Sequence, residues 1–472
     1  MGSREVTDWQ GKHVTVAGLG VSGLPAAKVL HGLGAKVTVV NDGDDARARE
    51  QAAELEALGV TVRLGDGATL PEGAELVVTA PGWKPDKPLF TAAREAGVPV
   101  WGDVELAWRL RGPDAAPWLC VTGTNGKTTT TRMLASILTA AGLRTAAVGN
   151  IGVSLLDAVL GDEPYDVLAV ELSSYQLHWA PSLRAHSAAV LNLAPDHLDW
   201  HGSMEAYARD KGRVYEGNQV ACVYNVADKA TEDLVREADV EEGCRAIGFT
   251  LGAPAPSQLG VVDGILVDRA FVEDRQKNAQ ELAEVADVDP PAPHNIANAL
   301  AAAALARAFG VPPKAVRDGL RAFTPDAHRI AHVADVDGVA YVDDSKATNT
   351  HAAQASLAAY GSIVWIAGGL AKGATFDELV ATSAERLRGV VLLGADRALI
   401  REALARHAPE VPVVDLDRTD TGAMSAAVQE ARRLAAEGDT VLLAPACASM
   451  DMFVNYNQRG DAFAQAVREL GT

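Results

Sequence analysis

The sequence predicts an α/β protein of three domains, each built on a mostly parallel β-sheet. The length, 472 residues, is that of about three domains of ordinary size. Short apolar runs alternate with helical patterns along most of the chain, which is typical of βαβ units. Two proline-containing polar stretches, 112–117 and 323–329, interrupt this alternation as linkers would. We therefore expect domains at 1–112, 113–327 and 328–472.

Composition and charge narrow the possible partners and the compartment. The net charge of −20 argues against binding to nucleic acid or to an anionic membrane. The four cysteines form no C-x-x-C pair, so no zinc or redox motif is expected, and scattered thiols fit a reducing compartment. Residues 1–10 are polar, unlike a signal peptide, and no run of 18 apolar residues exists. We expect a cytoplasmic protein with small-molecule substrates, no nucleic-acid or membrane partner, and a monomeric state.

The first block has a Rossmann-like opening. An expected strand at 14–17 leads into Gly18-Leu19-Gly20-Val21-Ser22-Gly23 and then into a helix to about Leu33. A second strand, 36–40, ends at Asn41-Asp42. Such glycines followed by an acid suit a dinucleotide or a nucleotide diphosphate, without distinguishing NAD from a UDP-sugar. A glycine turn that serves packing alone is the alternative.

The strongest motif opens the second block. Gly123-Thr124-Asn125-Gly126-Lys127-Thr128-Thr129 lies between an expected strand, 118–121, and a helix that runs to about Ala141. Strand, glycine-rich loop, Lys-Thr and helix make a phosphate-binding P-loop, in which Lys127 neutralises phosphates and the Thr128 hydroxyl holds Mg²⁺. The first glycine lies three residues before the second rather than five. A glycine turn with a solvated lysine is the alternative.

Acidic residues and a histidine follow two later strands of this block. The strand 167–170 ends in Glu171, and the strand 188–193 runs into Asp196 and His197. Because such side chains lie at the carboxyl edge of a sheet, we expect Glu171 to complete a Mg²⁺ site beside the P-loop. His197 could equally be structural, and Lys211, in a helical stretch at 203–215, is by itself typical of a solvated face. A hairpin is expected at 260–267, and the Pro/Asp-rich stretch 286–293 should lead into a helix of this block.

The third block alternates strand and helix five times. Its expected strands are 339–342, 363–367, 390–393, 411–414 and 440–443. Polar motifs follow three of them, at 343–349, 367–372 and 444–449. Open α/β sheets bind ligands at the carboxyl ends of strands, and lysines with hydroxyls there suit a dicarboxylate and a nucleotide phosphate. Taken singly, each motif could be a capping turn.

In this order and spacing, the motifs resemble those of the Mur ligases over the whole chain, and especially the glutamate-adding members. Further stretches that carry the resemblance are Gly149-Asn150-Ile151-Gly152, 171–176, His294-Asn295 and His328-Arg329. The resemblance implies a Rossmann-like N-terminal domain for a UDP-linked substrate, a central P-loop ATPase-like domain with a mostly parallel sheet, and a Rossmann-like C-terminal domain for glutamate and nucleotide. It implies an ADP-forming amide ligase that joins D-glutamate to UDP-N-acetylmuramoyl-L-alanine through an acyl phosphate.

The resemblance also implies a role for each matching position. The catalytic residues would be Lys127, Glu171, His197 and Lys211. ATP would contact Gly123, Thr124, Asn125, Gly126, Lys127, Thr128, Thr129, Asn295, Arg329 and Asp344. Two Mg²⁺ ions would be held by Thr128, Glu171, His197 and Lys211, the last as a CO₂-derived carbamate. The UDP-linked substrate would contact Val21, Ser22, Asp42, Asn150, Ser173 and Gln176, and glutamate would contact Lys346, Thr348, Lys372, Ser449, Met450 and Tyr456.

Several positions and rival functions limit this interpretation. Pro195, Met450 and Tyr456 depart from the residues common in the family, which weakens claims about fine specificity. A folylpolyglutamate synthetase would lack the first domain, and a diaminopimelate-adding ligase would show an Asn-Pro-Arg stretch. An alanine-adding ligase is harder to exclude, although Lys346 and Lys372 favour an acidic amino acid. A Rossmann oxidoreductase and a non-catalytic nucleotide-binding module are the rivals of other classes, and the sequence does not distinguish D- from L-glutamate.

Overall fold

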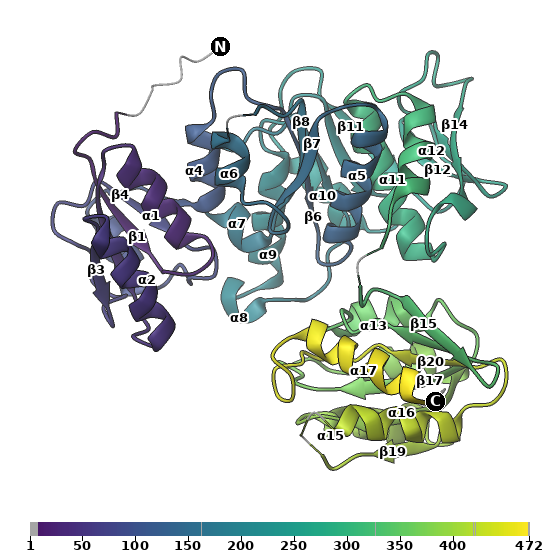
Figure 1. The fold of residues 1–472 in the computed structure, drawn as a ribbon. Coiled ribbons are helices and arrows are strands. Elements are labelled where there is room, and N and C mark those ends of the chain that lie inside the picture. The colour runs from purple at the N-terminus through teal and green to yellow at the C-terminus, as the bar shows by residue number, and fades with distance from the viewer. Residues whose placement is uncertain (1–7, 162, 326, 419, 421, 471–472) are drawn as a thin grey trace. The chain divides into compact units, whose positions relative to one another are not determined.

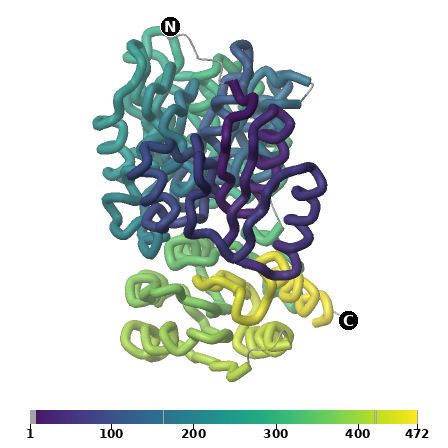
Figure 2. Tube along the Cα trace, turned by 90° about the vertical axis from the view of Figure 1, so that its left-hand side faces the viewer, coloured from purple at the N-terminus to yellow at the C-terminus, as the bar shows by residue number. Residues whose placement is uncertain are grey.

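The computed structural model describes residues 8–161, 163–325, 327–418, 420 and 422–470. Most of the polar N-terminal stretch and Asp326, in the second expected linker, lie outside the described residues. The chain passes through three sheets in sequence order (Figure 1). Figure 2 traces the path of the chain as a tube coloured from the N-terminus to the C-terminus. Its contacts divide it into two compact units, Met1–Val288 with Ile296–Phe323, and Asp289–Asn295 with Thr324–Thr472.

The first sheet has five parallel strands in the order β3-β2-β1-β4-β5. A Cβ on Gly23 would lie 1.8 Å from the carbonyl oxygen of Gly18, so the predicted glycine turn needs its glycines for close packing. The strands are β1 (His13–Ala17), β2 (Lys36–Asn41), β3 (Thr61–Leu64), β4 (Leu76–Thr79) and β5 (Val100–Gly102). The helices are α1 (Gly23–Gly32), α2 (Ala46–Ala57), α3 (Pro88–Glu95) and α4 (Asp103–Leu110).

The last of these helices is joined to the next sheet. Trp108 of α4 packs edge-on against Trp118, with ring centroids 5.0 Å apart. Both rings belong to one hydrophobic core that continues into the middle sheet. The first two sheets therefore share a compact unit, and the expected boundary at 112 stays a prediction.

The middle sheet has nine strands in the order β14-β13-β12-β11-β10-β9-β6-β8-β7. Its strands pair in parallel from β7 to β12, whereas β13 and β14 are antiparallel additions. The predicted hairpin is confirmed, because Val262 pairs with Ile265 across Asp263 and Gly264, both with positive φ. The strands are β6 (Trp118–Thr122), β7 (Thr145–Gly149), β8 (Val167–Glu171), β9 (Ser187–Val190), β10 (Ala221–Asn225), β11 (Arg245–Phe249), β12 (Gln258–Val262), β13 (Ile265–Asp268) and β14 (Gln280–Glu284).

Small residues let the helices of this block pack closely. A Cβ on Gly319 would lie 2.3 Å from the Cα of Ile137, so α12 rests directly on α5. The alanines at 299–304 of α11 are fully buried in the same core. The helices are α5 (Lys127–Ala140), α6 (Leu155–Leu160), α7 (Ser174–His178), α8 (Leu198–His201), α9 (Met204–Gly212), α10 (Lys229–Glu237), α11 (Pro293–Ala308) and α12 (Pro313–Ala322). The stretch 286–293 does lead into a helix, as predicted, but residues 289–295 pack with the second unit.

The third sheet has six strands in the order β15-β16-β20-β17-β18-β19. All five predicted strands are present, and β15, an antiparallel edge strand, was not predicted. Apolar residues of α13, α14 and α15 cover one face, and those of α16 and α17 cover the other. The strands are β15 (Ala331–Val336), β16 (Val339–Asp343), β17 (Ile363–Gly368), β18 (Leu387–Leu393), β19 (Val413–Asp415) and β20 (Thr440–Leu443). The helices are α13 (Thr350–Leu357), α14 (Asp377–Ser383), α15 (Arg397–His407), α16 (Ala423–Leu434) and α17 (Tyr456–Leu470).

The predicted fold class is therefore confirmed: three α/β sheets, mostly parallel, follow one another along the chain. In the third sheet, β16, β20 and β17 are neighbours, so the polar motifs that follow them meet at one edge. None of the helices within the described ranges has the length and apolar character needed to cross a lipid bilayer.

Candidate active site

The glycine-rich loop between β6 and α5 has the geometry of an anion-binding turn. Gly126, the residue before α5, has φ +84°, and a Cβ there would lie 2.4 Å from Oδ1 of Asn298. Asn192, just after the neighbouring strand β9, fixes the loop by accepting from the Asn125 N–H at 2.9 Å and donating to the Asn125 carbonyl at 3.1 Å. The loop is thus fixed at the start of α5, where free backbone N–H groups of a helix can bind an anion.

Two lysines converge on a single carbonyl of this loop. Nζ of Lys127, the first residue of α5, donates to the Gly123 carbonyl oxygen at 2.8 Å. Nζ of Lys211, near the end of α9, donates to the same oxygen at 2.8 Å. The structure therefore brings together two residues that lie far apart in the sequence, although Lys211 by itself had the sequence signature of a solvated lysine.

The surroundings of Lys211 favour its neutral amine. The residue is 1% exposed, and its Nζ lies 4.7 Å from the ring centroid of Tyr207. Burial, followed by the charge of Lys127, lowers the pKa of Lys211 well below its usual value. A second ammonium group this close disfavours the charged form of the buried Lys211. Only a neutral lysine amine is a nucleophile.

Glu171 lies beside the same loop at the end of β8. Its strand pairs with β6 so that Glu171 is opposite Val121, just before the loop. Oε1 accepts from Nδ2 of Asn150 at 3.0 Å. Oε2 is buried and has no hydrogen-bond partner among the described residues. A buried, unsatisfied carboxylate oxygen beside a P-loop fits a hard cation such as Mg²⁺.

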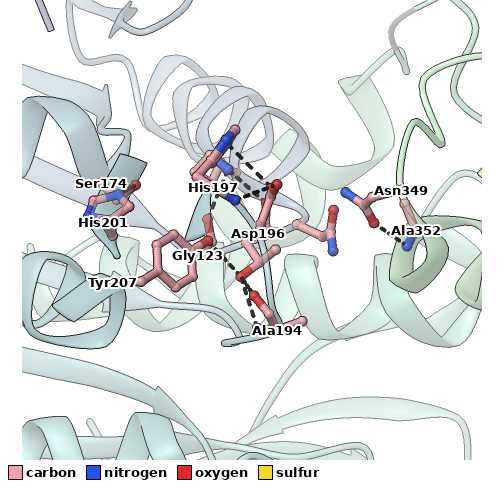
Figure 3. Close-up of polar contacts among 12 residues, drawn as sticks. Gly123, Ser174, Ala194, Asp196, His197, His201, Tyr207, Asn349 and Ala352 are labelled. Atoms are coloured by element: carbon pink, nitrogen blue, oxygen red, sulfur yellow. Dashed lines mark hydrogen bonds and ion pairs between the residues drawn. The ribbon is translucent and has the colours of Figure 1, made fainter. Parts of the chain in front are cut away.

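Asp196 and His197 complete this group of residues (Figure 3). Nε2 of His197 lies 3.4 Å from Oδ2 of Asp196. Burial lowers the pKa of His197; the charge of Asp196 opposes this shift and that of Lys127 adds to it. Within the described residues, no group of three or more His, Cys, Asp or Glu side chains is placed to hold a metal ion, so a metal here would also need oxygens such as the Thr128 hydroxyl. With that addition, the residues present fit Mg²⁺.

A buried aspartate next to Lys211 was missed by the sequence analysis. Oδ2 of Asp210 contacts Nδ1 of His178 at 2.9 Å and Nδ1 of His201 at 3.0 Å. Nε2 of His201 lies 3.0 Å from Oγ of Ser174, the first residue of α7. This chain of side chains ties α7, α8 and α9 together and fixes the helix that carries Lys211. No local motif marks it, because its members come from three helices.

Asp103 was also missed by the sequence analysis. It joins Ser22 of the first block to Gln176 of the second block, and both are predicted contacts of the UDP-linked substrate. Its Oδ2 accepts from Oγ of Ser22 at 3.0 Å and from Nε2 of Gln176 at 3.4 Å. Burial raises the pKa of the Asp103 carboxyl. Ser173 and Gln176 form a capping box at the start of α7, and Asn150 reaches Glu171. Ser22, Ser173 and Gln176 thus form one hydrogen-bonded group around Asp103, and Asn150 is bonded to Glu171 beside the loop.

The other two predicted contacts of the first sheet lie at its surface. Val21 is 86% exposed. Asp42 forms an ion pair with Lys87, whose Nζ lies 4.4 Å from the ring centroid of Trp83. Lys87 and Trp83 had no signal in the sequence, since each is isolated from any motif.

In the second unit, the predicted nucleotide contacts lie near one another. Asn295 is buried and donates to the Pro290 carbonyl at 3.2 Å. Burial and then the charge of Arg329 lower the pKa of His294, the preceding residue, to about 4. A cavity of about 420 Å³ opens beside them within this unit. Its lining includes Pro290, Ile330, His332, Val342 and Tyr360.

Asp344, the third predicted nucleotide contact in this unit, is a buried carboxylate with a raised pKa. Oδ2 accepts from the Ser356 hydroxyl, and Oδ1 accepts from the Ile330 N–H at 3.3 Å. Burial raises the pKa of Asp344 to about 6, although Ser356 and Arg329 oppose the shift. The folded pKa lies above the unfolded value of about 4. The favourable contribution of the protonated acid is therefore complete below pH 4 and is lost as the pH rises through about 6.

We expect Asp344→Asn to raise stability at neutral pH. The amide can donate to Oγ of Ser356, which itself donates to the Ala352 carbonyl, so every polar group stays paired. The variant avoids the cost of ionising a buried acid and should gain about 1–3 kcal/mol at pH 7, with no gain at pH 4. Melting temperatures of both proteins between pH 4 and pH 8 test this. A melting-temperature difference that does not change with pH would contradict it, and the exposed Asp335→Asn is the control.

The three polar loops at the edge of the third sheet are bound to one another. Leu370 and Ala448 exchange backbone hydrogen bonds of 2.9 Å, which places the Lys372 loop against the Ser449 loop. The Ala446 N–H donates to the Ala347 carbonyl at 2.9 Å. Nζ of Lys346 lies 3.9 Å from the ring centroid of Tyr456. The loops that carry the predicted glutamate contacts, Lys346, Thr348, Lys372, Ser449, Met450 and Tyr456, are therefore linked.

A buried arginine that the sequence analysis missed holds these loops in place. Arg459 of α17 is 2% exposed. It donates to Oγ of Ser345 at 2.9 Å, to the Ser345 carbonyl at 2.8 Å and to the Cys447 carbonyl at 3.0 Å. A planar guanidinium can make all three bonds at once, which a lysine cannot.

Known proteins match this chain along its length. Residues 12–102 match the MurD-like N-terminal domain of Mur ligases, residues 121–306 the Mur ligase middle domain, and residues 328–447 the glutamate ligase domain of Mur ligases. Among solved structures, a MurF ligase from Thermotoga maritima in complex with ADP aligns with a TM-score of 0.57 at 16% identity, covering 99% of this chain and 97% of that one. A UDP-N-acetylmuramate-alanine ligase from the same organism aligns with a TM-score of 0.53 at 18% identity, covering 97% and 99%. At such identities the two structures show a shared fold.

Curated relatives are much closer in sequence. A protein of Streptomyces avermitilis named UDP-N-acetylmuramoylalanine–D-glutamate ligase is 89% identical, covering 99% of this chain and all of that one. A protein of the same name from Thermobifida fusca is 60% identical, covering 98% of this chain and 99% of that one. The chain therefore belongs to the Mur ligase family and groups with relatives named UDP-N-acetylmuramoylalanine–D-glutamate ligase.

Proposed function

We propose that this ATP-dependent ligase adds D-glutamate to UDP-N-acetylmuramoyl-L-alanine, with release of ADP and phosphate. The observation that carries the proposal is the convergence of Lys127 and Lys211 on the Gly123 carbonyl, with Glu171 on the adjoining strand. Such a site suits phosphoryl transfer to a carboxylate. The names of the relatives supply the amino acid and the UDP-linked acceptor.

The first step forms an acyl phosphate. The alanyl carboxylate attacks the γ-phosphorus of ATP, and the bond to the β-phosphate oxygen breaks to give ADP. Phosphoryl transfer of this kind depends on positioning and charge neutralisation more than on a covalent enzyme group. The loop N–H groups and Lys127 would bind the phosphates, and Ser173 and Gln176 would orient the alanyl end of the acceptor. Asn295, Arg329 and Asp344 would hold the nucleoside, with the apolar walls of the neighbouring cavity facing the purine.

Two groups absent from the protein chain itself would assist. Mg²⁺ would supply charge neutralisation on the transferring phosphate, and Thr128, Glu171 and His197 would hold it. We also propose that the neutral Lys211 amine takes up CO₂, losing one proton, and becomes an anionic carbamate. The low pKa of Lys211 and its position between Tyr207 and the glycine-rich loop support this.

The second step forms the amide. The amine of glutamate attacks the acyl carbon, a tetrahedral intermediate forms, and phosphate leaves. Lys346 and Lys372 would pair with the two carboxylates of glutamate, and Thr348 and Ser449 would add hydrogen bonds. Domains at 1–112, 113–327 and 328–472 would then serve the UDP-linked acceptor, ATP and glutamate. A ligase that uses ATP and a UDP-linked precursor would work in the cytoplasm.

We expect Arg459→Lys to raise the KM for glutamate by about tenfold, with a smaller change in kcat. Lysine cannot replace the three hydrogen bonds that join the Ser345 and Cys447 loops, and leaving one buried carbonyl unpaired costs about 1–3 kcal/mol. Steady-state kinetics with varied glutamate measures the effect. The matched control is Arg468→Lys, an exposed arginine on the same helix. An unchanged KM would show that the loops keep their positions without Arg459.

The test of the function is phosphate release from ATP by the purified protein with Mg²⁺, bicarbonate and UDP-N-acetylmuramoyl-L-alanine. Parallel reactions contain D-glutamate, L-glutamate, L-alanine or no amino acid. Release only with D-glutamate supports the proposal and its stereochemistry. Release with another amino acid would keep the ligase chemistry and move the chain to a sister activity. No release with any of them would refute the proposed reaction.

A further inference from the structure

Two of the four cysteines lie side by side in the middle sheet, although they are 22 positions apart in the sequence. Cys222 is the second residue of β10, and Cys244 directly precedes β11. The two strands pair with Cys222 opposite Ala246. Because Cys244 comes two positions before Ala246, both side chains point to the same face of the sheet. Their sulfur atoms are 3.9 Å apart.

The two thiols differ in exposure and acidity in a complementary way. Cys222 is 2% exposed, whereas Cys244 is partly exposed. The contact with Cys244 raises the pKa of Cys222, and the contact with Cys222 lowers the pKa of Cys244. Cys244 is therefore the thiol that a reagent in solution reaches, and its thiolate is the more available one. Cys222 lies behind it as a resolving thiol.

The remaining cysteines provide an internal comparison. Cys120 and Cys447 are buried at 0% and 1% exposure. Burial raises the pKa of Cys120 and raises that of Cys447 to about 12. Buried thiols of this kind are out of reach of a reagent in solution. Any selective thiol chemistry of the folded protein should thus begin at Cys244.

We propose that Cys222 and Cys244 form a reversible redox site that closes to an intramolecular disulfide by exchange with a low-molecular-weight disulfide. The Cys244 thiolate attacks one sulfur of the small disulfide, which breaks its S–S bond and releases one thiolate. The Cys222 thiol then loses its proton and attacks Sγ of Cys244, and the second small thiolate leaves. The protein loses two electrons and two protons, and the small disulfide becomes two thiols. A small dithiol reverses the sequence.

The local structure permits this closure. The sulfurs must approach from 3.9 Å to the disulfide distance of about 2.05 Å, which needs side-chain rotation together with a small backbone shift at Cys244, the residue just before β11. The Arg245 N–H donates to the Val220 carbonyl at 3.0 Å, so the backbones on either side are already joined. The pair lies at the amino ends of β10 and β11, whereas the glycine-rich loop follows the carboxyl end of β6 in the same parallel sheet. The cross-link would thus join the amino ends of two inner strands, at the opposite end of the sheet from Lys127 and the glycine-rich loop.

The test treats the native full-length protein with glutathione disulfide, alkylates the remaining thiols in denaturant, and maps the peptides by mass spectrometry. We expect the wild type to lose two alkylation sites and to yield one linked peptide that contains both residues, with dithiothreitol restoring all four thiols. Cys222→Ala should stop at a glutathione adduct on Cys244. Cys244→Ala should remain unmodified, and Cys120→Ala should behave as the wild type. Circular dichroism confirms that each variant is folded.

Four alkylated thiols in the treated wild type would overturn the proposal. A glutathione adduct that persists on wild-type Cys244, or a linked peptide that contains Cys120 or Cys447, would overturn it as well. The oxidised wild type is also expected to melt at a higher temperature than the reduced protein, because a disulfide restricts the unfolded chain. An equal or lower melting temperature of the oxidised protein would show that the cross-link does not stabilise the fold.

Discussion

Replacing Lys127 by alanine is expected to lower the rate of amino-acid-dependent phosphate release by about a thousandfold or more. The lysine begins α5, and its Nζ lies over the loop, 2.8 Å from the carbonyls of Gly123 and Thr124. In the free protein these bonds hold the ammonium at the place where phosphate would lie. The charge matters most when negative charge spreads over the transferring phosphate, so kcat should fall more than the affinity for ATP.

The folded state should survive this change, because Lys127 is only partly buried and neutral alanine favours a helix start no less than lysine. A matched control is Lys229→Ala, which removes the first residue of α10 after another strand of the same sheet. Lys229 is exposed and, among the described residues, pairs with Asp233 four residues on, so loss of its side chain should leave turnover unchanged. Normal turnover in Lys127→Ala would contradict the assignment of the glycine-rich loop as the phosphate-binding site.

Most of the fold follows from local patterns in the chain. Buried strands such as β6, β8 and β20 are continuous apolar runs, and their positions were predicted to within one or two residues. The edge strand β15 was not predicted, because Ala331–Val336 is half exposed and carries a histidine and an aspartate. Its place in the sheet depends on pairing with β16, which is a tertiary effect. The packing of α4 into the hydrophobic core of the middle sheet was not predicted either, because it too depends on a tertiary contact.

The residues of the candidate site likewise fall into those that belong to local motifs and those that depend on tertiary contacts. Residues inside contiguous motifs, such as Lys127, Glu171 and Asp344, could be named from the sequence because the motif fixes the local geometry. Asp103 and Arg459 could not, since their contacts join segments 73 and 114 positions away. The proximity of Cys222 and Cys244 could not be predicted either, because it depends on the pairing of β10 with β11. Residues whose role depends on tertiary contacts form no periodic pattern or local motif in the sequence.

Replacing Lys211 by arginine is expected to reduce turnover about as severely as replacing it by alanine, by roughly a thousandfold. Arginine keeps a positive charge and can donate to the Gly123 carbonyl, so it would preserve activity if Lys211 served as a cation. It cannot add CO₂, because its guanidinium stays protonated. The comparison of the two variants therefore separates a charge role from a carbamate role. The control is Arg209→Lys, an exposed position on the same helix.

The same proposal predicts that wild-type turnover depends on dissolved CO₂. The burial of Lys211 and the charge of Lys127 lower the pKa of its amine and so favour the neutral form, which is the form that reacts with CO₂. Protein that is degassed at mildly acidic pH should lose activity and regain it when bicarbonate is added, whereas the arginine variant should respond to neither treatment. The carbamate itself can be observed by NMR after addition of ¹³C-labelled bicarbonate. An active arginine variant, or wild-type turnover that ignores bicarbonate, would leave Lys211 as a structural donor to the glycine-rich loop and assign the second metal site to other oxygens.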